Sequence, residues 1–443
     1  MPLIPTLHLD APADRDRINA IRQNLSLAPL LLAGIAEDEN SPATAVRRII
    51  REVRDRGDAA ICEFTRQYDD VDLTGKPLRV SPDQLAAAVK QADPQFLAAL
   101  DISIDNVRRY QTAMLPPDPP PIRPAGGGPA ARLAVRYEPL SRVGVYVPGG
   151  AGAYPSSVVM TVAPAQAAGV KSIAICSPMR GGRVSPAVLA AAMRLGVDEV
   201  YGIGGAQAIA AMALGTPSIP KVDKIVGPGN TYVQLAKKEM FGIVDIDSFA
   251  GPSEVIVLAD DSASAAMVAA ELLAQAEHAP GSCLLITSSG SLAQAVQLEL
   301  NRQVPALLRR DLTIKALGYA SAIIVTPTPD AAIELVNAFA PEHLQITTKN
   351  SRADAERITS AGGIFIGEKT PVAAGDYLAG PSHVLPTSGT AKFFSGLSAE
   401  SFRKRISVVE YDNSALTAAA NTICILAATE GFDAHVKSVQ ARQ

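Results

Sequence analysis

Four of the five histidines lie in the C-terminal part of the chain, and each has an acid or an amide close by in sequence. They are His278, His343, His383 and His435. Imidazole, carboxylate and amide groups are the side chains that ligate metal ions and transfer protons near neutral pH. A single histidine is usually structural, but four in this pattern indicate a site that combines metal binding with acid–base chemistry.

The stretch LLAQAEHAP ends an alanine-rich segment that is expected to be a helix. Gln275 and His278 are three residues apart, so both would lie on one face of that helix, whereas Glu277 would point elsewhere. An amide oxygen and an imidazole on one face can ligate a metal ion. A polar patch at a helix end would look the same, so these two residues alone do not decide between the interpretations.

Two further groups of polar residues follow. Glu342 and His343 are neighbours just before the predicted strand LQITT, and an extended backbone would direct their side chains to different targets. Asp376 and His383 lie in the loop AAGDYLAGPSHVLPT, which is rich in glycine and proline. A long ordered loop with polar side chains is more often functional than a buried loop.

The last pair is Glu430 and His435, on the final predicted helix. A separation of five is poor spacing for one helical face, so either the helix breaks at Gly431 or the two side chains reach different points. Because the cysteines are scattered singly, the available ligands are imidazole, carboxylate and amide oxygen. This donor set suits zinc best and manganese next.

The composition limits the classes of function. With 443 residues, 48% of them hydrophobic and 19% charged, the chain should form two to four packed domains. A net charge of -4 argues against nucleic acid or an anionic membrane as the main partner. Four single cysteines argue against a disulfide framework and favour a reducing, cytoplasmic setting.

The pattern of apolar residues predicts an α/β fold with two Rossmann-like parallel-sheet domains. Residues 1–114 are expected to form a helical segment, and the proline- and glycine-rich residues 115–132 a linker or loop. Short apolar runs then alternate with helical patterns, which is typical of βαβ units. We place a first α/β domain at 133–250, a second at 251–370, and a small loop and helix segment at 371–443.

Three glycine turns follow predicted strands of the first domain: VPGGAGAYP, GIGGAQA and GPGN. None is a complete dinucleotide fingerprint, so each could be a simple tight turn. Parallel α/β sheets bind ligands at the carboxyl ends of their strands. Tyr146, Gln207 and Asn230 lie at or just after such ends and could hold a nucleotide, although Asn230 could equally be a helix N-cap.

Taken together, the motifs resemble the L-histidinol dehydrogenase family. They are VGVYVPGG, GGAQAIAA, KVDKIVGPGN, AGPSEV, LLAQAEHAP, APEHLQI, GDYLAGPSHVLPT, SGLS followed by FRKR, and a closing E-x-x-x-x-H. The resemblance implies an enzyme that uses zinc and NAD to oxidise L-histidinol through the aldehyde to L-histidine, the final step of histidine biosynthesis, with two NAD reduced.

The resemblance also implies a role for each site residue. One zinc ion per subunit would be held by Gln275, His278, Asp376 and His435. Acid–base chemistry would fall to Glu342 and His343, and NAD contacts to Tyr146, Gln207 and Asn230. The substrate would be surrounded by Ser253, His343, His383, Glu430 and the zinc ligands. The family forms an intertwined homodimer, in which the last zinc ligand comes from the partner chain.

Ser388 and Lys392 stand where this resemblance leads us to expect glycine and arginine, and residues 115–132 are unusually rich in proline and glycine. Two other functions remain open. One is a related zinc and NAD dehydrogenase that acts on another alcohol, such as a sulfopropanediol. The other is a non-catalytic zinc-binding dimer, which would need neither Glu342 nor the three residues assigned to NAD.

Overall fold

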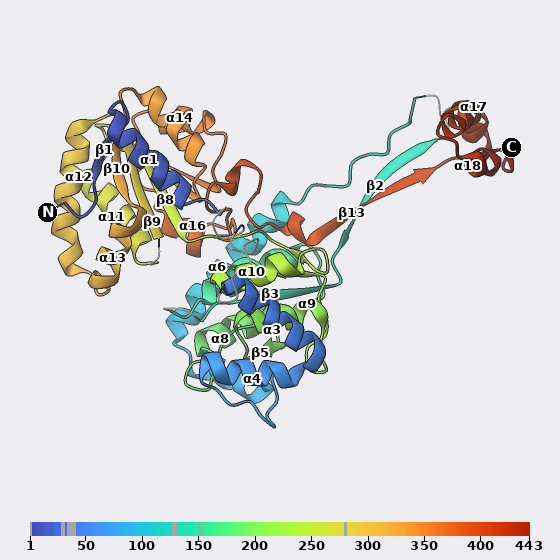
Figure 1. Ribbon diagram of the computed structural model, residues 1–443, viewed down its shortest axis with the longest axis horizontal. Helices are drawn as coiled ribbons and strands as arrows, with labels where there is room; N and C mark the ends of the chain where they lie inside the picture. Colours follow the sequence, from blue (N-terminus) through green and yellow to red (C-terminus); the bar gives the residue numbers. More distant parts are fainter. Residues whose placement is uncertain (1, 28–31, 33–40, 126–130, 150–151, 279–280) are drawn as a thin grey trace.

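The computed structural model describes residues 1–443 except residues 1, 28–31, 33–40, 126–130, 150–151 and 279–280. It consists of two lobes and a long arm that projects away from both (Figure 1). Each lobe is built on a parallel sheet, so the predicted α/β class with two parallel-sheet domains is confirmed. In the described part of the chain, no helix combines the length and the apolar character that a membrane crossing requires.

The first lobe contains a five-stranded parallel sheet. In spatial order its strands are β5 (Val200–Tyr201), β4 (Ser172–Cys176), β3 (Arg142–Tyr146), β6 (Lys224–Val226) and β7 (Asp245–Ile246). Strands β4 and β5 lie on one side of β3, and β6 and β7 on the other. The order of strand addition therefore reverses between β3 and β6, and parallel α/β sheets commonly bind ligands at such a point. Strand β7 was not predicted, because one of its two residues is the charged Asp245 and no apolar run marks it.

Helices cover both faces of this sheet. They are α3 (Pro42–Arg56), α4 (Asp58–Asp69), α5 (Pro82–Gln91), α6 (Pro94–Met114), α7 (Pro155–Ala167), α8 (Pro186–Arg194), α9 (Gly205–Leu214) and α10 (Thr231–Met240). Along β3, Val143 and Val145 pack with α5 to α8, whereas Tyr146 packs on the opposite face with α3, α4, α9 and α10. Burial on both faces explains why these strands read as continuous apolar runs.

The second lobe contains a six-stranded parallel sheet. In spatial order its strands are β1 (Thr6–His8), β10 (Ala322–Val325), β9 (Gly281–Thr287), β8 (Ser253–Ala259), β11 (His343–Thr347) and β12 (Gly363–Ile366). Strand β1 lies within residues 1–114, for which only helices were predicted. It forms because the edge of β10 offers free backbone groups to a distant segment, which a three-residue sequence cannot reveal.

The helices of the second lobe likewise cover both faces of its sheet. They are α1 (Pro12–Asn24), α11 (Ala265–Ala276), α12 (Gly290–Gln303), η1 (Val304–Ala306), α13 (Arg310–Ala320), α14 (Pro329–Phe339), α15 (Ser351–Glu356) and α16 (Val372–Tyr377). Val255 and Val257 of β8 pack with α11, α12 and α13, while Ile256 and Leu258 pack with α1 and α14. The N-terminal residues are therefore divided between the lobes, since α1 packs here and α3 to α6 pack on the first lobe.

The arm is an antiparallel ribbon of β2 (Arg132–Pro139) and β13 (Arg403–Glu410), with α17 (Asn413–Thr429) and α18 (Asp433–Gln440) at its tip (Figure 1). The short helices η2 (Thr390–Lys392) and η3 (Ala399–Phe402) precede β13. Except for Arg132, strand β2 lies within residues 133–250, which we placed in the first α/β domain, but it belongs to the arm. Its sequence RLAVRYEP mixes charged and apolar residues because both faces of the ribbon are partly exposed.

The predicted C-terminal helix is broken between α17 and α18. Gly431 has a φ of 81°, a left-handed conformation that glycine adopts without strain. The break at Gly431 is one of the two explanations offered for the spacing of Glu430 and His435, and it is confirmed.

Candidate active site

Glu342 and His343 lie at the start of β11, beside the start of β8, where Ser253 and Glu254 are found. Val255 of β8 is paired with His343 in the sheet. This group therefore lies at the amino ends of the strands of the second lobe. Most parallel α/β sheets bind ligands at the opposite, carboxyl ends.

Two donors fix the Glu342 carboxylate. The Ser253 hydroxyl donates to Glu342 Oε2 at 2.6 Å, and the backbone N–H of Glu254 donates to the same oxygen at 2.9 Å. The Glu342 residue is only 6% exposed. A buried carboxyl group that is held in this way is oriented for proton transfer.

The imidazole of His343 is held from one side and free on the other. Its Nδ1 lies 3.1 Å from the backbone oxygen of Glu254, which holds a proton on Nδ1, so in the neutral form of the imidazole Nε2 carries the lone pair. Nε2 is buried without a hydrogen-bond partner and lies 3.5 Å from Asp376 Oδ1. Burial lowers the pKa of His343, but the charges of Glu342 and Asp376 outweigh it and raise the pKa well above its ordinary value.

Asp376 lies on α16 and is surrounded by imidazoles. Burial raises the pKa of its carboxyl group, but His343, His383 and His278 together lower it below the ordinary value. The carboxylate is therefore ionised and faces three potential partners. A negative charge shared among imidazoles is the environment expected of a metal ligand.

His383 connects the two lobes. Its Nδ1 lies 3.1 Å from the backbone oxygen of Asp376, and its Nε2 lies 3.3 Å from the hydroxyl of Ser157, near the start of α7 in the first lobe. Burial lowers the pKa of His383. The segment from Asp376 on α16 to His383 in the following loop therefore lies between the amino ends of the strands of the second sheet and the first lobe. The sequence predicted a loop at Asp376, but this residue is helical.

Of the two zinc ligands predicted in LLAQAEHAP, Gln275 lies in a helix and His278 does not. Helix α11 ends at Ala276, and the N–H of His278 donates to the Gln275 backbone oxygen at 3.1 Å, so His278 lies in the following turn and is exposed. Gln275 is buried, and its amide nitrogen has no hydrogen-bond partner. A Cβ on Gly281 would lie 3.5 Å from that nitrogen and 3.3 Å from the Ser253 backbone oxygen, so this glycine lets the end of α11 approach β8.

The remaining predicted site residues, Glu430 and His435, lie at the tip of the arm and are exposed (Figure 1). The chain's own lobes therefore do not bring them to the other site residues. Within the described ranges, no group of three or more histidine, cysteine, aspartate or glutamate side chains could hold a metal ion. Of the four predicted zinc ligands, only His278 and Asp376 are both of these residue types and on the second lobe. Gln275 is an amide, and His435 lies at the tip of the arm.

The three residues predicted to contact NAD lie at the carboxyl ends of the first sheet or at the helices that follow. The Tyr146 side chain is buried at the end of β3, its hydroxyl accepts a hydrogen bond from the Gly205 N–H at 3.1 Å, and burial raises its pKa to about 12. Gln207 is buried in the first turn of α9, which has no side-chain cap. Asn230 caps α10, as the alternative interpretation of this residue predicted.

A buried ion pair fixes the GPGN turn beside Tyr146. Lys237 Nζ lies 2.5 Å from Asp247 Oδ1 and donates to the Gly227 backbone oxygen at 2.7 Å, while the Gly227 N–H donates to Asp247 Oδ2 at 2.7 Å. Gly227 has a φ of 116°, and a Cβ there would lie 2.1 Å from the Tyr146 backbone oxygen. Sequence analysis did not identify Lys237 or Asp247, although an aspartate just after a short apolar run is the signal that was available.

Comparisons with known proteins identify the family. The sequence model described as histidinol dehydrogenase matches residues 35–443. The chain is 49% identical over 403 residues to a histidinol dehydrogenase of Rhodopirellula baltica, covering 91% of this chain and 87% of that protein. It is 45% identical to one from a Synechococcus species, covering 90% and 92%. The chain belongs to the histidinol dehydrogenase family.

A crystal structure of histidinol dehydrogenase from Elizabethkingia anophelis has the same architecture. Its TM-score to this chain is 0.89 at 31% sequence identity, and the match covers 100% of this chain and 98% of that one. The resemblance that the motifs indicated is therefore confirmed at the level of both sequence and fold.

Sequence analysis missed two buried acids of this histidinol dehydrogenase family member. Glu271 lies one helical turn before Gln275 and accepts a hydrogen bond from the Val372 N–H at 3.0 Å, which ties α11 to the start of α16. Glu254 accepts from the backbone N–H groups of Ser388 and Glu342. The sequence did contain an indication of each. Glu271 interrupts the apolar run AAELLA, and Glu254 directly precedes the apolar run VIVLA.

Ser388, the departure from the expected glycine, has a φ of 60°. This left-handed conformation costs an ordinary residue about 1–2 kcal/mol, which explains why glycine was expected there. Its Oγ would lie 2.1 Å from a Cβ on Gly251. The serine is thus accommodated because the facing residue has no side chain.

We expect Gly251→Ala to lower the thermal unfolding midpoint, since overpacking typically costs about 1–3 kcal/mol. The same substitution in a Ser388→Gly background should cost much less, because the Oγ that crowds the new methyl group is gone. Thermal unfolding of the two single variants and the double variant measures this coupling. Equal costs of Gly251→Ala in both backgrounds would show that the two residues do not limit each other.

Proposed function

We propose that this chain oxidises L-histidinol to L-histidine through the aldehyde, with zinc and NAD as cofactors. The main support is the buried Glu342–His343 pair, whose free imidazole nitrogen lies 3.5 Å from Asp376 in a member of the histidinol dehydrogenase family. A base, a second proton acceptor and a metal ligand within one small group are what two successive oxidations of an alcohol require.

The zinc ligands we propose are Gln275, His278 and Asp376 of one chain and His435 of a second copy. The donor types suit zinc, and the buried amide nitrogen of Gln275 lacks a hydrogen-bond partner. A half-turn of this amide would place its oxygen, the atom that binds zinc, at the same position. When bound, zinc supplies a Lewis acid that can hold the substrate and polarise its reacting oxygen. Glu271 supports this assignment, because it joins the helix of Gln275 to the helix of Asp376.

NAD, which accepts a hydride in each oxidation, would bind at the carboxyl ends of β3, β5 and β6 through Tyr146, Gln207 and Asn230. The N-terminus of α9 has no side-chain cap, so its backbone N–H groups can bind a phosphate. The Tyr146 hydroxyl meets the first residue of α9 and the Lys237–Asp247 pair fixes the adjacent turn, so these loops form one rigid surface. His383 and Ser157 join this lobe to the second.

In the first oxidation, His343 Nε2 removes the hydroxyl proton of the alcohol while the hydride leaves its carbon. The Glu254 backbone oxygen keeps the other imidazole proton on Nδ1 and so directs the lone pair of Nε2 toward Asp376. If Asp376 were a zinc ligand, less of its negative charge would act on His343. The pKa of His343 would then be raised less, which would favour the neutral imidazole that can accept a proton.

The second oxidation requires water to add to the aldehyde. The Glu342 carboxylate can accept a proton from this water, because Ser253 and the Glu254 N–H hold it in one orientation. Loss of the second hydride from the hydrated aldehyde yields the carboxylic acid. Ser253, His383 and Glu430 complete the proposed substrate contacts, with Glu430 delivered by the second copy.

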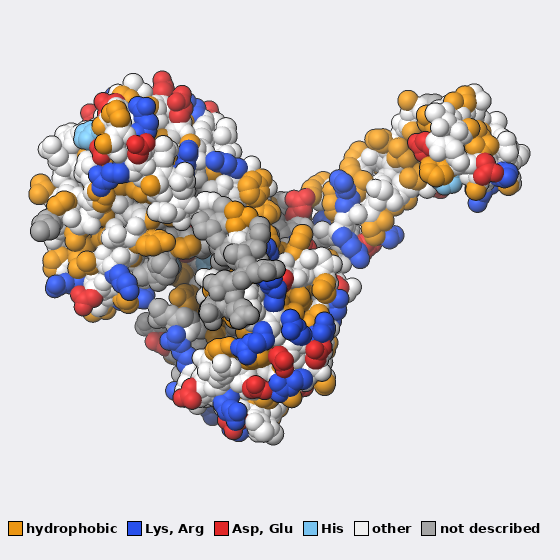
Figure 2. All heavy atoms as spheres, viewed as in Figure 1, with side chains coloured by type: hydrophobic (Ala, Val, Ile, Leu, Met, Phe, Trp, Pro, Cys, Tyr) orange, Lys and Arg blue, Asp and Glu red, His pale blue; other side chains and the backbone are white. Residues whose placement is uncertain are grey.

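The arm supports the proposed homodimer. It exposes large apolar side chains on an isolated ribbon and helix pair, among them Val409 (68% exposed), Ile425 (57%), Leu426 (61%) and Phe432 (51%). Figure 2 shows hydrophobic side chains gathered over this part of the chain. A two-stranded ribbon is marginal alone, and such patches mark interaction surfaces. Against a second copy the arm would be covered and would bring His435 to that copy's zinc ligands.

Substrate selection is tested with L-histidinol and a sulfopropanediol as alternative sole substrates for NAD reduction by the zinc-loaded protein. We expect NADH only with L-histidinol. The reverse result would assign the chain to the related activity on another alcohol. Binding of NAD is measured separately by calorimetry, and a lack of affinity would favour the non-catalytic dimer.

The four cysteines are all free, and we propose the reducing cytoplasm as the setting.

A further inference from the structure

We infer that Glu254 is a positioning residue, which holds Glu342 and His343 in their working geometry through hydrogen bonds to both. This inference rests on the proposed function. Glu254 is not among the residues assigned to zinc, NAD or substrate above. It is 4% exposed and lies at the start of β8, directly after Ser253.

Glu254 and Glu342 are joined by a reciprocal pair of hydrogen bonds across neighbouring strands. The Glu254 backbone N–H donates to Glu342 Oε2 at 2.9 Å, and the Glu342 backbone N–H donates to Glu254 Oε1 at 3.2 Å. The Glu254 backbone oxygen faces His343 Nδ1 at 3.1 Å. One residue therefore orients both members of the acid–base pair, and its own side chain fixes the backbone from which they project.

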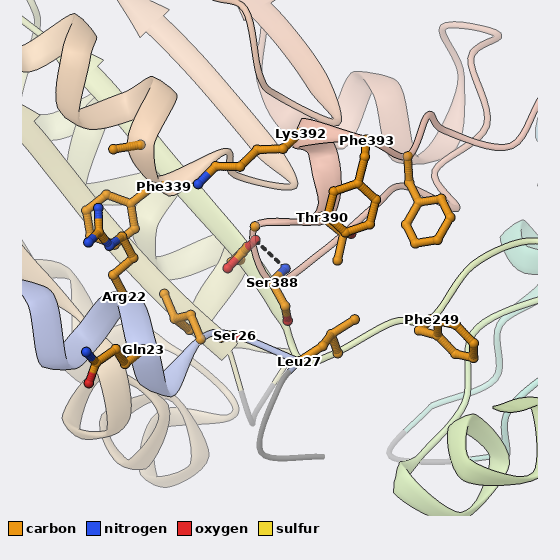
Figure 3. Close-up of a pocket in the computed structure, with 15 residues that line it drawn as sticks. Arg22, Gln23, Ser26, Leu27, Phe249, Phe339, Ser388, Thr390, Lys392 and Phe393 are labelled. Atoms are coloured by element: carbon orange, nitrogen blue, oxygen red, sulfur yellow. Dashed lines mark hydrogen bonds between the residues drawn. The ribbon is translucent and has the colours of Figure 1, made fainter. Parts of the chain in front are cut away.

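The same carboxyl oxygen also holds the loop that follows His383. The Ser388 N–H donates to Glu254 Oε1 at 2.8 Å (Figure 3), and the Gly251 N–H donates to Thr387 Oγ1 at 2.6 Å. Loss of the Glu254 acceptor would leave two backbone donors, those of Ser388 and Glu342, without this partner. Buried unpaired donors are costly, so the local backbone would move to find others.

The acceptor oxygen, and not a negative charge, is the property that these contacts require. Burial, followed by the charge of Glu342, raises the pKa of Glu254 to about 8. Two ionised carboxylates side by side would repel each other, and a neutral carboxyl group on Glu254 avoids this repulsion. Glu254 also lines a cavity of about 690 Å³, which is shown in Figure 3.

Three variants test this role in the full-length, zinc-loaded protein. Glu254→Gln keeps an uncharged acceptor of the same length, and it should retain at least about half of the wild-type kcat. Glu254→Asp keeps the carboxyl group but shortens its reach, and Glu254→Leu removes the acceptor. Both should lower kcat by about 10- to 100-fold, since small misplacements of catalytic groups have effects of this size. The KM for NAD and the zinc content should be unchanged in all three.

Glu254→Asp ensures that the test remains decisive if Glu254→Leu does not fold. A loss of more than about tenfold in a folded, zinc-loaded Glu254→Gln would overturn the inference, because it would mean that the charge or proton of Glu254 is needed. Near-normal kcat in Glu254→Asp would also overturn it. Failure of the proposed function is seen separately, as an inactive wild-type protein with L-histidinol.

Discussion

Replacement of His343 with asparagine is expected to lower kcat for NADH formation from L-histidinol by about 10²- to 10⁴-fold, the range that general acid–base catalysis contributes. The amide of asparagine can still donate toward the Glu254 backbone oxygen in place of Nδ1. It has no atom at the position of Nε2, the nitrogen that is free in the wild-type protein and faces Asp376. The variant would thus keep the hydrogen bond to Glu254 and lose the nitrogen that acts as the base.

Zinc content and NAD affinity should remain unchanged in His343→Asn, since His343 is in neither proposed binding set. The matched control is His8→Asn, which removes an exposed histidine on the second lobe. This control should behave like the wild-type protein. Activity of His343→Asn within a few-fold of the control would remove His343 from the role of base.

The second large expected effect is the loss of activity when a zinc ligand on the second lobe or on the arm is replaced. We expect Asp376→Ala and His435→Ala each to abolish activity and zinc binding when every subunit contains the change. In a purified heterodimer with one change on each subunit, activity should return to about half that of the wild-type protein. One site then combines an intact second lobe with the intact arm of the other chain, while the other site has lost both ligands.

The reverse arrangement provides the control. A heterodimer of one doubly substituted chain and one wild-type chain contains the same two changes, yet it should be inactive, because each site lacks one ligand. If instead each chain used its own arm, this second heterodimer would retain half of the activity and the first would have none. The two tagged heterodimers therefore distinguish a shared site from a self-contained one.

The lobes could be predicted because their strands are buried on both faces. SIAIC and CLLIT, for example, are apolar apart from Ser172 and Thr287 at their ends, and both form interior strands, β4 and β9. Strands that depend on distant partners were not found. β1 is defined by the edge of β10 and β2 by β13, and neither partner is close in sequence.

The candidate site was predicted in part for a related reason. Residues such as Gln275 and His278, or Glu342 and His343, are neighbours in sequence, so their types and spacing drew attention to them. The role of Glu254 depends on the register between β8 and β11, which places it against Glu342 across 88 residues of sequence. The role of Ser388 could not be predicted for the same reason. It depends on the hydrogen bond to Glu254 and on the lack of a side chain at Gly251.

The most direct test of the proposed four-electron oxidation counts NADH formed per substrate. The purified, zinc-loaded protein is given limiting L-histidinol and excess NAD, and the product is identified. We predict two NADH per L-histidinol, with L-histidine as the product, because the site contains both a base for the alcohol and a carboxylate for the water. One NADH with the aldehyde as the product, or no NADH from zinc-loaded protein, would contradict the account.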